Sequence, residues 1–146
     1  MKTLNTFILA LSATAVLGTT ALYAQTVVFA DVPFDFTAQT VTVPAGRYAL
    51  QPLSRTSGVI RMMNLETHRS VQVLAPSNLS TYNGKDTDSG KLIFHRYGDQ
   101  YFFSEVWTPS GLRGCAAPSR QEREIKARGA ERQIAFVGIR RGGAPQ

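Results

Sequence analysis

Four residues that could move a proton or hold an ion lie close together in the sequence: His95, Arg96, Asp99 and Glu105. A histidine near a carboxylate is the usual pair for general acid–base catalysis, which makes this stretch the first candidate for an active site. The residues lie on two apolar runs joined by Gly98-Asp99, a pair that predicts a two-residue hairpin turn. Counting from that turn pairs His95 with Phe102, Ile93 with Ser104 and Leu92 with Glu105. His95 then faces away from both Arg96 and Glu105, because side chains alternate between the faces of a strand. We therefore predict no catalytic residue here and do not expect an enzyme.

Metal binding is not predicted either. The two histidines, His68 and His95, are far apart in the sequence, and neither a cysteine pair nor a His-x-x-x-His spacing accompanies them. Zinc sites use such short ligand spacings. The acidic stretch 86–90 lacks the third oxygen position and the downstream glutamate of a calcium loop, so a turn explains it better. We predict no metal and no other cofactor.

Aromatic side chains are concentrated in the hairpin and offer a second kind of site. The runs Lys91–Tyr97 and Gln100–Trp107 are apolar on both faces, so the hairpin is either covered on both sides or presents an aromatic surface to a ligand. We expect Arg96 to stack on Tyr101 as a cation–π pair, and Tyr82, in a long polar loop, is a candidate lid. The predicted ligand-binding residues are Tyr82, Arg96, Tyr97, Tyr101, Phe103 and Trp107.

The single cysteine, Cys115, is predicted to lie in a loop. One cysteine forms no intrachain disulfide, so the hydrophobic core must carry the stability of the fold. In an oxidising compartment a lone loop cysteine is either a free thiol or one half of an intermolecular bridge. A homodimer joined through Cys115 is therefore one of the predicted assemblies.

The elements that position these residues are predicted to be almost all strands. Apolar residues alternate through most of the chain between turns rich in Gly, Pro and Asn, and Gln133–Arg140 suits a closing strand. Before it, Ser119 and Glu122 fit a capping box that begins a helix over about 120–128, which Gly129 ends. We predict an all-β domain, an antiparallel barrel or sandwich of about seven to nine strands with one short C-terminal helix.

The N-terminal segment 1–24 has the features of a secretory signal peptide. Lys2 gives a positive start, Phe7–Leu17 is an apolar run, and small residues precede Ala24. The run is shorter than the roughly 20 residues that cross a bilayer. Cleavage after Ala24 is favoured, with Ala21 as the alternative site.

The rest of the chain is expected to be one domain in the periplasm or outside the cell. Residues 25–141 form this domain in the prediction, and residues 142–146 form a disordered tail. No second apolar segment approaches membrane-spanning length, so no transmembrane segment is expected after cleavage of the signal.

Of the net charge of +6, the segment from Arg113 onward contributes +5, with eight basic residues against three glutamates, and Lys2 supplies the rest. Acidic and basic residues balance over residues 25–112, and the excess of lysine and arginine begins at Arg113. These basic residues are interleaved with glutamates, and Phe136 is the one aromatic residue among them, whereas single-strand nucleic-acid sites combine a basic groove with several stacking rings. We predict no nucleic-acid partner. An anionic component of the cell envelope is the charged partner that this segment fits.

Three stretches carry a resemblance to a group of proteins: Val32–Phe36 (VPFDF), Pro44–Tyr48 (PAGRY) and Phe94–Phe102 (FHRYGDQYF). They resemble short exported proteins that recur in acidobacterial genomes and are functionally uncharacterised. The similarity runs from about Val32 to Arg128, and FHRYGDQYF is its most specific part. The resemblance implies export and the limits of the domain, but it implies no activity and no site residue.

The function predicted from the sequence is that of an exported, non-catalytic binding module for a small apolar or saccharide ligand. The ligand is expected in the mouth of the barrel or on the hairpin aromatics. The alternative is a structural or interaction protein of the cell envelope, attached through its basic C-terminal segment or through Cys115. An enzyme is the third and least favoured class.

Overall fold

The computed structural model describes residues 27–54, 57–76, 90–109 and 113–142. The predicted signal peptide, the loop residue Tyr82 and residues 143–146 lie outside this part of the chain. Within it, no helix is long and apolar enough to cross a membrane. The elements are β1 (Val28–Val32), β2 (Phe36–Ala38), β3 (Val41–Val43), β4 (Gly46–Pro52), β5 (Val59–Asn64), β6 (Ser70–Leu74), β7 (Gly90–Tyr97), β8 (Gln100–Trp107), β9 (Arg113–Cys115), α1 (Arg120–Ala127) and β10 (Gln133–Arg141).

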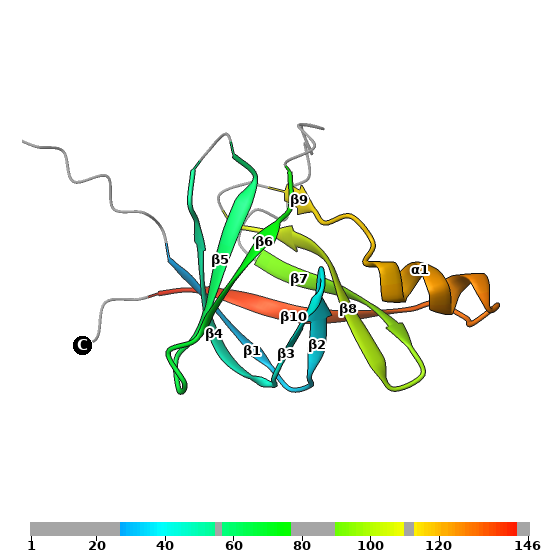
Figure 1. The fold of residues 1–146 in the computed structure, drawn as a ribbon. Coiled ribbons are helices and arrows are strands. Elements are labelled where there is room, and N and C mark those ends of the chain that lie inside the picture. The colour runs from blue at the N-terminus through cyan, green and yellow to red at the C-terminus, as the bar shows by residue number, and fades with distance from the viewer. Residues whose placement is uncertain (1–26, 55–56, 77–89, 110–112, 143–146) are drawn as a thin grey trace, which may run out of the picture.

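The strands form one sheet that curls into a nearly closed barrel (Figure 1). Their order is β3-β2-β8-β7-β10-β1-β4-β5-β6, and β9 also pairs with β8. The pairs are antiparallel except β2–β8, which is parallel at Thr37 and Phe102. The end of β6 approaches β9, where the backbone N–H of Cys115 donates to the carbonyl of Pro76 at 3.3 Å. The predicted all-β barrel with a short C-terminal helix is confirmed, and the described residues form ten strands with one parallel pair.

The inner face of the barrel is a packed hydrophobic core. Alternate residues of each strand point inward, as Val28, Ala30 and Val32 do on β1. Aromatic rings fill the centre, where the ring of Phe94 meets those of Phe36 and Phe103 edge-on at centroid distances of 5.1 and 5.9 Å. Side chains therefore occupy the inside of the barrel, as in other small barrels.

The β7–β8 hairpin turns at Gly98 and Asp99, as predicted. Gly98 has a φ of +60°, in the left-handed region that glycine adopts without a steric penalty. The predicted cross-strand pairs nearest the turn are confirmed, including His95 with Phe102.

A β-bulge farther along the hairpin changes the predicted register. Ser104 is the extra residue on β8, so Ile93 pairs with Glu105 and Leu92 pairs with Val106. The predicted pairs of Ile93 with Ser104 and of Leu92 with Glu105 are therefore wrong. Because the bulge adds one residue, Glu105 lies on the same face as His95. The predicted placement of these two side chains on opposite faces is therefore wrong.

Helix α1 has the predicted location and one unpredicted contact. Its N-cap Ser119 accepts a hydrogen bond from the backbone N–H of Glu122 at 3.0 Å, and Gly129, with a φ of +82°, follows its last turn. The return half of the predicted capping box is not formed, because the Glu122 carboxylate bonds to the barrel instead. Glu122 is the buried residue of the helix, and Ile125 is half-buried. Polar contacts therefore contribute strongly to holding α1 on the sheet.

Candidate functional site

The outer face of β7, β8 and β10 holds two groups of side chains that could carry a function. Helix α1 lies beside the β7–β8 hairpin, on the side of the barrel away from β5 and β6 (Figure 1). We define the covered half of this outer face as the two residues that contact Glu122 of α1 and the two buried residues beside them on β8: His95, Tyr97, Phe102 and Ser104. The uncovered half consists of Lys91, Trp107, Ile134, Phe136 and Gly138.

The covered half contains a line of hydrogen-bonded side chains from three elements. Glu122 of α1 lies 2.6 Å from His95 Nδ1 on β7, through its Oε1 atom. On the other side of the imidazole, His95 Nε2 lies 3.1 Å from the Ser104 hydroxyl on the bulge of β8. Tyr97 donates its hydroxyl hydrogen to the same Glu122 oxygen at 3.4 Å. We call Ser104, His95 and Glu122 the relay.

The hydrogen bond to the carboxylate sets the tautomer of His95. The side chains of Glu122 and His95 are 5% and 17% exposed. A carboxylate only accepts hydrogen bonds, so in the neutral imidazole Nδ1 carries the hydrogen and Nε2 accepts from Ser104. Burial raises the pKa of Tyr97 above its ordinary value, and the negative charge of Glu122 raises it further. The covered half is thus a polar network in a largely dry setting.

Of the three relay residues, the sequence marks only His95 as a candidate for chemistry. Ser104 was missed because an unbulged hairpin pairs it with Ile93, and nothing in the local pattern marks the extra residue. Glu122 was identified but given a different partner, the N-terminus of its own helix. The signal that could have found it is a carboxylate on the barrel-facing side of a helix that has few apolar residues.

The uncovered half exposes large apolar side chains beside a cation. Phe136 and Ile134 on β10 are 62% and 53% exposed. The ammonium nitrogen of Lys91 lies 4.2 Å from the centroid of the Trp107 ring and 5.5 Å from that of the Phe136 ring. Gly138, which pairs with Lys91 across β10 and β7, has open space where a Cβ would be. The result is an apolar surface with a cation at its centre and a shallow gap beside it.

Neighbouring charges fix the orientation of Trp107. The indole Nε1 donates to Glu105 Oε2 at 2.8 Å, and Arg113 Nη2 donates to the same oxygen at 2.9 Å. The Arg113 guanidinium lies 4.5 Å from the indole centroid. Glu105 is thereby paired with Arg113, whereas no carboxylate of the described residues forms an ion pair with Lys91. This leaves the uncovered half with a positive charge.

The predicted ligand-binding residues do not form one surface. Tyr97 is buried in the covered half, and Phe103 is buried in the core. Tyr101 stacks on Phe34 with centroids 3.8 Å apart, and the Arg96 guanidinium lies 5.5 Å from the Tyr101 ring. The predicted cation–π pair is therefore confirmed, at the barrel end near the hairpin turn. Ligand binding by these residues stays a prediction.

Two further predicted residues have different positions. Trp107 is the one predicted aromatic residue that lies in the uncovered half. Cys115 is half-buried on β9, where it pairs with Glu105, so it lies in a short strand and not in the predicted loop. Its pairing in a homodimer stays a prediction.

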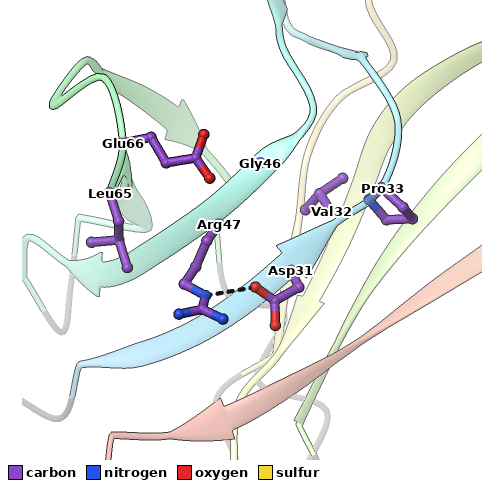
Figure 2. A pocket seen from close by; sticks show the side chains of 7 residues that line it. All are labelled: Asp31, Val32, Pro33, Gly46, Arg47, Leu65 and Glu66. Atoms are coloured by element: carbon purple, nitrogen blue, oxygen red, sulfur yellow. Dashed lines mark hydrogen bonds and ion pairs between the residues drawn. The ribbon is translucent and has the colours of Figure 1, made fainter.

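A cleft of about 610 Å³ lies elsewhere, near the ends of β1, β4 and β5. In Figure 2 Arg47 and Asp31 point toward each other across it, with Nε and Oδ1 2.8 Å apart. The hydrogen bond from Arg47 lowers the pKa of Asp31 below its ordinary value. No aromatic residue in the described part of the chain lines the cleft, and its ion pair is exposed to solvent. It is lined by Asp31, Val32, Pro33, Gly46, Arg47, Leu65 and Glu66.

Comparisons with known proteins identify no relative from which a role for the site could be inferred. No protein-family model matches the chain, and no curated protein or solved structure was found to be similar to it. Among the described residues, no three His, Cys, Asp or Glu side chains converge in an arrangement that could hold a metal ion. The strongest candidate for contact with another molecule is the uncovered half of the outer face.

Proposed function

We propose that this protein is an exported binding module whose ligand lies on the uncovered half of the outer face. The ligand class is a small molecule that combines an apolar chain or ring face with a negative charge, such as a fatty acid or an acidic saccharide. Export to the periplasm or the cell exterior follows from the predicted signal peptide.

The exposure of Phe136 and Ile134 next to Trp107 is the main support for this proposal. Two large apolar side chains more than half exposed on one strand leave apolar surface in water, which a ligand would remove. The neighbouring Trp107 adds a ring whose orientation Glu105 fixes, so little entropy is lost when a ligand packs against it. The apolar part of the ligand is therefore assigned to these three side chains.

The charge of the ligand is inferred from Lys91. Its ammonium lies between the Trp107 and Phe136 rings and forms no ion pair with a carboxylate of the described chain. A carboxylate on the ligand would pair with this cation, and partial removal of water strengthens such a bond. The charge of Lys91 and the exposed apolar side chains therefore favour the same ligand, a molecule with a negative charge and an apolar part.

Trp107 is the one tryptophan in the chain, so its fluorescence reports directly on the site. The mature protein is titrated at low salt with decanoate and with trigalacturonate, and with the neutral counterparts decanol and galactotriose. At least one charged probe is expected to shift the emission and to bind about tenfold or more tightly than its neutral counterpart, as for a charge-assisted bond. The two charged probes separate an apolar chain from a saccharide as the ligand.

Gly138 offers a matched pair of variants for this titration. Gly138→Glu places a carboxylate opposite Lys91 and should abolish the preference for the charged probe, whereas Gly138→Ser adds an uncharged side chain to the same open space. No spectral change with either charged probe would contradict the proposal. Unchanged binding by Gly138→Glu would show that the ligand lies elsewhere.

A further inference from the structure

The relay in the covered half has the connectivity of a nucleophilic serine. From its geometry we infer that Ser104 is a nucleophile activated by His95 and Glu122, and that the protein cleaves small carboxylic esters. The hydroxyl lies 3.1 Å from His95 Nε2, and Glu122 Oε1 lies 2.6 Å from Nδ1 on the far side of the ring. Serine, histidine and a carboxylate in this order are recognised by geometry and role on unrelated folds. This activity goes beyond the binding function proposed above.

The elements around the relay hold each of its three side chains in position. Glu122 is buried and also accepts from the Tyr97 hydroxyl, so its carboxylate is fixed at the imidazole. The bulge directs Ser104 toward His95 while the next residue, Glu105, continues along the outer face. Bulges of this kind are over-represented next to active sites, where they re-aim a side chain. The Ser104 carbonyl accepts from the backbone N–H of Ala116 at 2.8 Å, which anchors the bulge to the chain after β9.

Ser104 is 8% exposed and lies at the end of the covered half that adjoins the uncovered half. Ile93 separates the Ser104–Glu105 bulge from Phe136, because Ile93 pairs with Glu105 on one side and with Phe136 on the other. Neighbouring strands are about 4.8 Å apart, so the exposed Phe136 ring is roughly two strand spacings from the bulge. An ester whose apolar part packs on Phe136 and Ile134 would thus direct its carbonyl toward Ser104.

The chemistry requires no group beyond the relay, the ester and water. Ser104 Oγ attacks the carbonyl carbon as its proton passes to His95 Nε2, and Glu122 stabilises the imidazolium that forms. The C–O bond to the leaving alcohol breaks, and His95 returns the proton to the departing alkoxide. Water then attacks the acyl-Ser104, giving a proton to His95, and the bond to Ser104 breaks. The products are one alcohol and one carboxylic acid, with the proton back on Ser104.

The experiment is labelling of the folded mature protein with an alkyl fluorophosphonate, followed by intact mass measurement and peptide mapping. One adduct on Ser104 is expected, formed with displacement of fluoride. Ser104→Ala should remove it, whereas Ser70→Ala, at an exposed serine on edge strand β6, should label like the wild type. Circular dichroism of each variant shows that it is folded. An unlabelled wild type, or an adduct that persists in Ser104→Ala, would overturn the inference.

Hydrolysis of p-nitrophenyl butyrate distinguishes activation from a purely structural role of the relay. Glu122→Gln keeps the size of the side chain but removes its charge, and His95→Gln removes the general base. In folded variants both should lower kcat/KM and the labelling rate by roughly 100-fold or more, the usual contribution of general base catalysis. Labelling of Ser104 that is as fast in His95→Gln as in the wild type would show that the histidine does not activate it.

Discussion

The covered and uncovered halves lie on the same outer face of the same strands, one under α1 and the other in solvent. In the covered half, ionisable side chains bond to one another, and the ring of Phe102 is 1% exposed. In the uncovered half, the ring of Phe136 is 62% exposed, and Lys91 lies beside the aromatic rings. Alternation along the strands determines which side chains point away from the core, and the position of α1 determines which of these are buried from solvent. The outer face of this apolar hairpin is therefore buried in one half and exposed to solvent in the other.

Truncating one phenyl ring in each half tests the difference between the two halves most directly. Phe102→Ala removes a buried ring and should lower the free energy of unfolding by about 3–5 kcal/mol. Phe136→Ala removes an exposed ring and should change it by less than about 0.5 kcal/mol. Urea denaturation followed by circular dichroism measures both. Equal losses in the two variants would show that α1 does not separate the halves.

A second pair of variants tests whether polar contacts hold α1 in place. Glu122→Ala leaves the half-buried His95 and the buried Tyr97 without their acceptor and should cost about 1–3 kcal/mol. The control Glu124→Ala breaks the exposed pair with Arg120, and such i,i+4 pairs contribute about 0.3–0.5 kcal/mol. The free energy of unfolding from urea denaturation is again the measurement. A loss for Glu122→Ala no larger than that for Glu124→Ala would contradict the role given to the buried carboxylate.

The smallest expected effect concerns alkaline pH. The pKa of Tyr97 is raised in the folded protein, so its contribution to stability is present below the ordinary value of 10.0 and is lost as the pH rises through the raised value. Wild-type stability should therefore fall more steeply above pH 10 than that of Tyr97→Phe. The buried Tyr48, whose pKa is also raised, is present in both proteins and cancels in the comparison. Identical alkaline profiles would show that Tyr97 is not shielded by α1.

Much of the fold could be predicted because its signals are local. Gly98-Asp99 specified the hairpin turn, and the pairs beside it followed by counting. Ser119 and Gly129 marked the ends of the helix through backbone hydrogen bonding and positive φ. The cation–π pair of Arg96 with Tyr101 followed from the same register. Each of these features depends on residues only a few positions apart in the chain or across one turn.

The site was harder to predict because it depends on contacts between distant elements. His95 and Glu122 are 27 residues apart, and no local feature of the sequence indicates which face of the barrel the helix will contact. The bulge at Ser104 depends on how β8 fits both β7 and β9, so counting from the turn gives the wrong register beyond Phe94. The aromatic residues were grouped because they are close in sequence, although alternation divides them between the two sides of the sheet.

An amide NMR titration of the mature protein with decanoate and with trigalacturonate in turn tests directly whether the ligand lies on the uncovered half. The ligand-induced shifts of at least one probe are expected to centre on Lys91, Trp107 and Phe136, with the opposite side of the barrel unchanged. Shifts centred on the cleft at Asp31 and Arg47, or no shifts with either probe, would contradict the assignment of the binding site to the uncovered half.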